Sequence, residues 1–211
     1  MLAEDLKQYS INHTSPEKNV LKELSRETFL RMMYPSMLAG HSQGKLLELI
    51  SCMVKPSAIL EIGTFTGYST ICLAKGLQGD GRIYTIERNE ELEDTALKYF
   101  TKAGINKQVN FCLGEAAEII PSINESFDLI YIDGDKKDYP QFYRLVMDKV
   151  KSGGWIIADN VLWYGKVTGE SGSMDKDTKG IHEFNEIVNN DDRVENLLLP
   201  VRDGLMLIRK I

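Results

Sequence analysis

The sequence has little of what marks several common protein classes, beginning with positive charge. Its 211 residues include 25 Lys and Arg against 31 Asp and Glu, which gives a formal net charge of −6. Proteins that bind a nucleic-acid backbone usually present a basic face to it. The acidic balance therefore argues against a nucleic-acid partner, and we expect a small-molecule substrate instead.

Cysteine and long apolar runs are also scarce. The three cysteines, Cys52, Cys72 and Cys112, are widely spaced among apolar residues, which suits buried, reduced thiols and not a disulfide framework. The N-terminal MLAEDLKQYS lacks the basic and apolar regions of a secretory signal, and no apolar run approaches the roughly 18 residues of a membrane span. We therefore expect a cytoplasmic protein with no membrane partner.

Apolar residues recur with the alternating periods of strands and helices along most of the chain. Strands are predicted over seven short apolar runs: 58–62, 82–86, 109–113, 129–132, 155–158, 195–199 and 205–209. Helices are predicted over 16–33, 42–54, 68–77, 90–102, 116–120, 139–150 and 181–189. Ser15 is the expected cap of the first helix, with Pro16 at its first position. The alternation predicts one α/β domain whose largely parallel sheet is covered on both faces, with the last two strands as a hairpin.

Two of these strands end in side chains that carry oxygen. Asp133 closes the run DLIYID, and Asp159 with Asn160 closes GWIIADN. If the runs are neighbouring parallel strands, the three side chains converge at the edge where open α/β sheets bind ligands. An all-oxygen set suits Mg²⁺, or Mn²⁺ or Ca²⁺, better than zinc. Each residue alone could cap a helix, but their meeting at adjacent strand ends favours a metal site.

The first strand runs into a glycine turn, EIGTFTGYST. Gly63 and Gly67 allow a tight turn that brings backbone N–H groups close to a ligand. Glu61, before the turn, favours a cationic ligand over a pyrophosphate. Glu87, at the end of the second strand, stands where a carboxylate accepts hydrogen bonds from a ribose. The alternative is an ordinary strand-to-helix turn, with Glu87 at a helix N-terminus.

Four motifs, EIGTFTGYST, YTIERNEE, FDLIYIDGDKKDY and GGWIIADNVLWYGKV, together resemble the cation-dependent, S-adenosylmethionine-dependent O-methyltransferases, the family of caffeoyl-coenzyme A and catechol O-methyltransferases, in a bacterial-type member. The similarity covers nearly the whole chain and keeps the family's order of motifs. It implies the class I methyltransferase fold, a Rossmann-like three-layer sandwich with strand order 3-2-1-4-5-7-6. It also implies a single domain over residues 1–211, in which residues 1–54 form lid or dimer elements, and a homodimer.

The resemblance implies S-adenosylmethionine as the cofactor. Ser69 would donate to its methionine carboxylate, Glu87 would hold its ribose, and residues 114–116 would lie along its adenine. The full set of implied cofactor-binding residues is Met37, Leu38, Glu61, Gly63, Ser69, Glu87, Gly114, Glu115, Ala116 and Asp133.

The resemblance also assigns the remaining site residues. Asp133, Asp159 and Asn160 match the ligands of a divalent cation, with Mg²⁺ foremost. Lys136 matches a general base, which requires a neutral amine; the alternative is a solvated lysine in the charge run DGDKKD that pairs with a neighbouring aspartate. Trp163 would pack against the acceptor ring, or else be a core or dimer residue. The segment 165–179, rich in glycine, serine and charge, is predicted to be a mobile loop beside the metal site.

The implied reaction is methyl transfer to a hydroxyl of a small aromatic vicinal diol of catechol or caffeoyl type. The alternatives are an O-methyltransferase with another small acceptor and a cofactor-binding protein without turnover. An NAD-dependent oxidoreductase would need the middle glycine of G-x-G-x-x-G, which is absent here. A nucleic-acid base methyltransferase would carry an Asn/Asp-Pro-Pro-aromatic motif where this chain has DGDK.

Overall fold

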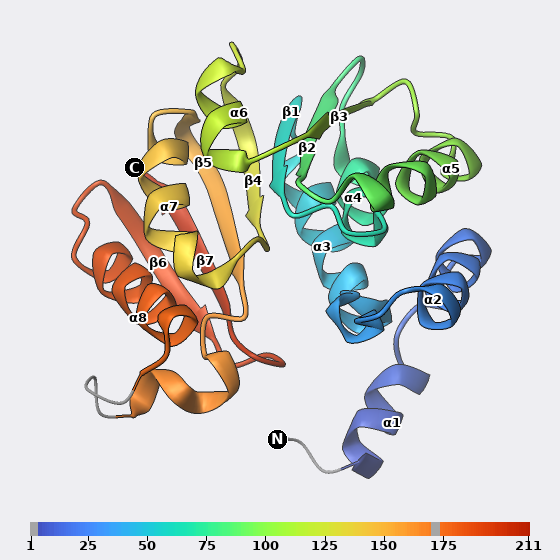
Figure 1. Ribbon diagram of the computed structural model, residues 1–211, viewed down its shortest axis with the longest axis horizontal. Coiled ribbons are helices and arrows are strands. Elements are labelled where there is room, and N and C mark those ends of the chain that lie inside the picture. The colour runs from blue at the N-terminus through green and yellow to red at the C-terminus, as the bar shows by residue number, and fades with distance from the viewer. Residues whose placement is uncertain (1–3, 170–173) are drawn as a thin grey trace.

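The computed structural model describes residues 4–169 and 174–211, and its framework is one seven-stranded sheet (Figure 1). The strand order is β3-β2-β1-β4-β5-β7-β6. β7 is antiparallel to both of its neighbours, and the other pairs are parallel. The predicted fold class is confirmed. The strands are β1 Ala58–Ile62, β2 Arg82–Glu87, β3 Val109–Leu113, β4 Phe127–Ile132, β5 Val150–Asp159, β6 Val194–Leu199 and β7 Leu205–Lys210.

Helices cover both faces of this sheet. The α-helices are α1 Glu4–Asn12, α2 Asn19–Arg31, α3 Gly40–Val54, α4 Tyr68–Leu73, α5 Glu93–Ala103, α6 Ala116–Ser122, α7 Tyr139–Met147 and α8 Lys176–Asn189. The short 3-10 helices are η1 Pro35–Met37, η2 Ala74–Gly76, η3 Glu90–Leu92, η4 Lys136–Asp138 and η5 Trp163–Thr168. None of the helices in the described ranges has the length and apolar content that crossing a membrane requires.

The sheet separates two apolar cores. Helices α6, α7 and α8 pack on one face, and α2, α3, α4 and α5 pack on the other (Figure 1). Successive strand residues point to opposite faces, so Leu60 and Ile62 belong to the first core and Ile59 to the second. Glu61 points toward the second core and is fully buried.

The strand register determines where the functional site forms. Ile62 in β1 lies opposite Ile86 in β2 and Ile132 in β4, and Ile132 lies opposite Ala158 in β5. The chain therefore leaves four adjacent strands at the same edge. The residues at these strand ends are Gly63, Glu87, Asp133 and Asp159.

The first predicted helix begins too early. Residues 15–18 are not helical, and α2 starts at Asn19. Contacts with the folded domain hold this segment: the Tyr68 hydroxyl donates to Glu17 Oε1 at 2.5 Å, and His41 Nε2 lies 2.9 Å from the Ser15 carbonyl oxygen. Helix α1 was not predicted, because its sequence lacks a regular apolar stripe.

Three other predictions also need correction. The helix predicted to 150 ends at Met147, because Val150 begins β5 and pairs with Phe127. The predicted loop 165–179 is helical at both ends: η5 includes 165–168, and α8 starts at Lys176, where the Asp175 carboxylate accepts from the Thr178 N–H at 2.8 Å. Its middle, 170–173, lies outside the described residues. All three cysteines are free, but Cys52 is exposed.

Phe184 offers a test of the core between α7 and α8. Its ring is fully buried and packs edge-on against Tyr139 and Tyr143, with centroids 5.4 and 5.8 Å apart. Phe184→Ala should lower the free energy of unfolding by about 3 to 5 kcal/mol in urea denaturation. Leu197→Ala, at a position 55% exposed on β6, is the matched control and should cost about 0.5 kcal/mol or less. Equal losses for the two variants would contradict this packing.

Candidate functional site

A cavity of about 800 Å³ opens at the carboxyl edge of the sheet. It brings together side chains that the sequence predicted for three separate purposes: cofactor, cation and acceptor. Glu61 is the exception among them, since it is not part of the cavity wall. The predicted residues that line the cavity are Met37, Leu38, Gly63, Ser69, Glu87, Gly114, Glu115, Ala116, Asp133, Lys136, Asp159, Asn160 and Trp163.

The glycine turn after β1 lets two loops approach closely. Gly63 has φ +96°, and a Cβ added there would lie 2.3 Å from the Asp133 carbonyl oxygen. No side chain fits in that space, and L-residues rarely adopt this backbone conformation. Glycine is therefore required where the β1 loop passes the start of the β4 loop.

Glu87 is held in place at the end of β2. Its Oε2 accepts from the Phe65 backbone N–H at 2.8 Å. Its Oε1 accepts from the backbone N–H groups of Arg88 and Asn89, each at 2.9 Å. The residue is 9% exposed and lines the cavity. These contacts fix a carboxylate at the cavity wall, where it can accept hydrogen bonds from a ligand's hydroxyl groups.

Glu61 lies beneath the turn, fully buried and outside the cavity wall. Its Oε2 accepts from the hydroxyl groups of Thr70 and Thr85, the latter at 2.6 Å. Its Oε1 is buried without a hydrogen-bond partner among the described residues. Burial raises the pKa of Glu61 to about 7, although the nearby hydroxyl groups of Ser69, Thr70 and Thr85 lower it. The structure thus places Glu61 as an internal polar group of the second core.

Asp133 and Asp159 meet on either side of the Tyr131 hydroxyl. That hydroxyl lies 3.5 Å from Asp133 Oδ2 and 3.2 Å from Asp159 Oδ2. Burial raises the pKa of Asp133 to about 6; the Lys136 charge opposes this shift and the Asp159 charge adds to it. Two carboxylates that share a sheltered site attract positive charge and hydrogen-bond donors.

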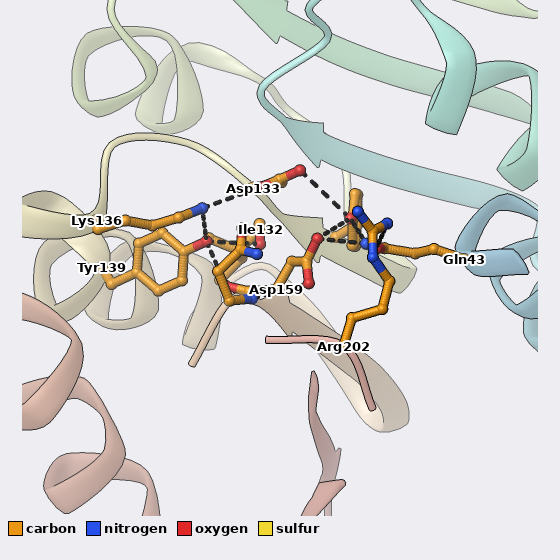
Figure 2. A network of polar contacts seen from close by, with 9 residues as sticks. Gln43, Ile132, Asp133, Lys136, Tyr139, Asp159 and Arg202 are labelled. Atoms are coloured by element: carbon orange, nitrogen blue, oxygen red, sulfur yellow. Dashed lines mark hydrogen bonds and ion pairs between the residues drawn. The ribbon is translucent and has the colours of Figure 1, made fainter. Parts of the chain in front are cut away.

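Lys136 supplies positive charge on one side of this pair (Figure 2). Its Nζ donates to Asp133 Oδ1 at 2.8 Å and to the Tyr139 hydroxyl at 2.7 Å. Burial alone lowers the pKa of Lys136, but Asp133 and Tyr139 outweigh it and raise the pKa above its ordinary value. The neutral amine expected from the sequence is therefore not the favoured form. The solvated lysine of the alternative interpretation is also wrong, because the residue is 9% exposed.

Asp133, Asp159 and Asn160 suit a hard cation by the chemistry of their donors. All three line the cavity; two are carboxylates and the third carries an amide oxygen, the ligand types that Mg²⁺ takes. Within residues 4–169 and 174–211, no three His, Cys, Asp or Glu side chains are grouped to hold a metal. Cation binding by this mixed set therefore stays a prediction.

The segment after β5 has an unusual backbone. Asn160, Trp163 and Tyr164 have φ values of 58°, 45° and 56°. Such conformations cost about 1 to 3 kcal/mol each and gather at functional sites. Trp163 and Tyr164 both line the cavity, and the buried Trp163 indole nitrogen has no partner among the described residues. An aromatic wall thus follows the acidic pair, and the packing of Trp163 against an acceptor ring stays a prediction.

Three polar residues of the site were missed from the sequence: Gln43, Tyr131 and Arg202. Gln43 donates from Nε2 to the Tyr131 hydroxyl at 3.0 Å and to Asp159 Oδ2, and Arg202 donates to Gln43 Oε1 (Figure 2). Gln43 could have been found, because it shares the buried face of α3 with Leu47 and Ile50. A turn residue such as Arg202 carries no comparable signal.

Residues 11–211 of the chain match the family described as O-methyltransferase. The chain belongs to this O-methyltransferase family. Among its curated relatives, a caffeoyl-CoA O-methyltransferase of Populus kitakamiensis is 33% identical over 229 residues, which cover 99% of this chain and 94% of the relative. The resemblance inferred from the four motifs is confirmed.

Solved structures of O-methyltransferases share the fold at full length. The O-methyltransferase from Bacillus cereus, in complex with S-adenosylhomocysteine, aligns with a TM-score of 0.92 and 30% identity over 98% of this chain and 97% of that one. TomG from Streptomyces achromogenes, involved in tomaymycin synthesis and solved with S-adenosylmethionine, aligns with a TM-score of 0.91 and 27% identity over 98% and 96%.

Glu61 makes the stability of the ligand-free protein depend on pH. Its folded-state pKa of about 7 exceeds the ordinary 4.5, so unfolding releases a proton between these values and stability falls as pH rises. The loss should reach about 3 kcal/mol above neutral pH, at 1.36 kcal/mol per pKa unit. Urea denaturation of wild type and Glu61→Gln at about pH 5 and about pH 8 measures it.

The difference in unfolding free energy between wild type and Glu61→Gln should shift in favour of the variant at the higher pH. Glu125→Gln, at an exposed position, is the control and should show no such shift. A difference that stays constant with pH would show that Glu61 keeps its ordinary pKa.

Proposed function

We propose that the protein transfers the methyl group of S-adenosylmethionine to a hydroxyl of a small aromatic vicinal diol, of catechol or caffeoyl type, with the help of a divalent cation, Mg²⁺ foremost. The observation that carries the proposal is the meeting of Asp133 and Asp159 in the same cavity as the glycine turn and the fixed Glu87 carboxylate. One cavity then holds a methyl donor and an acceptor side by side.

The cofactor half of the proposal rests on the turn and on Glu87. S-adenosylmethionine supplies a methyl group on a cationic sulfur. Gly63 and Ser69 both line the cavity, Ser69 from the first turn of α4, and Glu87 offers two carboxylate oxygens at its wall. The B. cereus relative and TomG hold S-adenosylhomocysteine and S-adenosylmethionine, respectively, which supports the same ligand class here.

The cation half rests on the three oxygen ligands. Asp133, Asp159 and Asn160 would hold the ion, whose positive charge would orient a vicinal diol and lower the pKa of its reacting hydroxyl. Trp163, on the wall beyond these residues, would pack against the acceptor ring. The caffeoyl-CoA O-methyltransferase relative supports an acceptor of this kind.

Lys136 is the proposed general base. It lies inside the cavity beside Asp133, within reach of a hydroxyl bound there. To accept a proton the amine must first lose one, and its contact with the Asp133 carboxylate works against that loss. Proton transfer by Lys136 therefore requires that its ion pair with Asp133 is weaker during turnover than in the structure.

The setting of the reaction is proposed as well. We infer action in the cytoplasm as a homodimer, without nucleic-acid or membrane partners. Exposed apolar side chains at Phe29 and Leu30 on α2, and at Met33 just after it, give this region of the N-terminal segment an apolar surface that suits a second copy of the chain.

Asp159→Ala tests whether the cavity is divided into a cofactor half and a cation half. Turnover should fall by more than about 100-fold, since even residues that only support metal ligands are worth about 10- to 100-fold. S-adenosylhomocysteine affinity should stay close to wild type, because Asp159 belongs to the cation half. Product formation from catechols, caffeate and caffeoyl-CoA, with Mg²⁺ and with EDTA, measures the first quantity, and calorimetry measures the second.

Asp192→Ala, at an exposed position, is the matched control for this experiment and should keep full turnover. Turnover that survives EDTA would remove the cation from the proposal. An Asp159→Ala variant that loses cofactor affinity as much as turnover would refute the separation of the two halves.

Lys136→Arg tests the base. The variant keeps the positive charge beside Asp133 but cannot accept a proton at neutral pH, so turnover should fall by about 100- to 10,000-fold. Cofactor affinity should remain. An activity within tenfold of wild type would assign Lys136 an electrostatic role and remove it as the base.

A further inference from the structure

A polar bridge crosses the site on the side of Asp159 away from Lys136 (Figure 2). The bridge consists of Gln43, which extends from α3, and Arg202, which extends from the turn between β6 and β7. Gln43 Nε2 donates to Asp159 Oδ2 and, at 3.0 Å, to the Tyr131 hydroxyl. Arg202 Nη1 donates to Gln43 Oε1. Gln43 is 5% exposed, so its contacts with Asp159 and Tyr131 are sheltered from water, whereas Arg202 lies at the surface.

The bridge dictates which end of the Gln43 amide faces Asp159. An arginine side chain carries only hydrogen-bond donors, whereas an amide has one donor end and one acceptor end. Arg202 therefore holds the acceptor end, Oε1, and turns the NH₂ group toward the Asp159 carboxylate. The reversed amide would set oxygen against oxygen at Asp159 and nitrogen against nitrogen at Arg202.

Arg202 is itself fixed in place. Its Nη1 also donates to the Ala39 carbonyl oxygen at the start of α3, and its backbone has φ 53°. The turn that carries it is bonded to the segment after Asp159: Val161 N–H donates to the Gly204 carbonyl at 3.2 Å, and Leu162 N–H donates to the Asp203 carbonyl at 2.9 Å.

The turn is also packed tightly against this segment. Gly204 has φ +88°, and a Cβ added there would lie 2.6 Å from a side-chain carbon of Leu162. The hairpin therefore supports both the chain that follows Asp159 and, through Arg202, the helix that carries Gln43.

We propose that Gln43 and Arg202 are positioning residues for Asp159, with Arg202 acting through Gln43. The inference rests on the proposed function, in which Asp159 is a cation ligand. Gln43 holds Oδ2, and the Asn160 backbone N–H holds Oδ1 at 2.8 Å, so the carboxylate has one orientation before any ion arrives. Partners that orient metal ligands in this way raise metal affinity.

The test measures Mn²⁺ binding to the cofactor-free protein. Binding is monitored through the electron paramagnetic resonance signal of the free ion. Gln43→Leu should weaken Mn²⁺ binding by about 10- to 100-fold, and Arg202→Met should weaken it in the same direction. The double variant should bind no more weakly than Gln43→Leu, because residues that act in series are not additive. S-adenosylhomocysteine affinity, measured by calorimetry, should not change.

Two further variants make the test specific. Arg202→Lys keeps a cationic donor and should bind Mn²⁺ more tightly than Arg202→Met. Arg209→Met, which removes an exposed arginine paired with Glu195 at 3.3 Å on the same hairpin, should bind like wild type. Thermal unfolding verifies that each variant is folded. If Arg202→Met is not folded, the Mn²⁺ affinity of Arg202→Lys is compared with that of wild type instead.

Each contrary result has a distinct meaning. Wild-type affinity in Gln43→Leu and Arg202→Met would overturn the inference while leaving the proposed function intact. Additive losses in the double variant would refute action through Gln43, as would equal affinities of Arg202→Lys and Arg202→Met. Equal losses of Mn²⁺ and S-adenosylhomocysteine affinity would mean general damage and not positioning. A wild-type protein that takes up no Mn²⁺ would overturn both the cation proposal and this inference.

Discussion

Two carboxylates held close together in a site sheltered from water are the constraint on which the rest of this structure depends. The charge of Asp159 contributes to raising the pKa of Asp133, and hydrogen-bond donors from several elements surround the pair. Lys136 approaches from the β4 loop, Gln43 from α3, and the Tyr131 hydroxyl stands between the two. Gln43 comes from a distant part of the sequence and Asp159 from the neighbouring strand, so the acidic pair and its donors meet only in the assembled fold.

The same strand ends create two very different glutamates. Glu87 accepts three backbone N–H groups and faces the cavity, so its charge is available to a ligand. Glu61, on the neighbouring strand, points into the second core, where one oxygen has no partner among the described residues and burial favours the neutral form. The resemblance to the family assigned both residues to the cofactor. In the structure they differ in position along the strands: Glu61 lies opposite Thr85 inside the sheet, whereas Glu87 ends β2 at the cavity.

Much of the fold could be read from the sequence because its strands are short apolar runs between glycine turns. β1 and β3 occur at their predicted bounds, and the acidic strand ends converge because parallel register requires it. The helix bounds of the N-terminal segment were harder to predict. Pro16 is a common first helical residue, yet contacts from Tyr68 and His41 hold its neighbours outside the helix, and no local pattern contains such tertiary contacts.

The electrostatic state of the site was the least predictable part. A lysine in the run DGDKKD can pair with several aspartates, and its sequence neighbours do not decide among them. The fold selects Asp133, three residues before it, and adds the Tyr139 hydroxyl. The amine is thereby stabilised as a cation, opposite to the form that base catalysis needs. A pKa depends on the distances between groups, and those distances are known only once the strands are paired.

The contact of Arg202 with Gln43 likewise could not be predicted from the sequence, because it joins residues that are far apart in the chain. Arg202 lies 159 residues from Gln43 in the sequence and contacts it because the closing hairpin folds back beside β5. The antiparallel β7 thus completes the sheet and also brings a cation to the rim of the acidic site. The hairpin and α3 lie at opposite ends of the chain, and each holds the other through this contact. The orientation of Asp159 therefore depends on the last elements of the chain as much as on the strand that carries it.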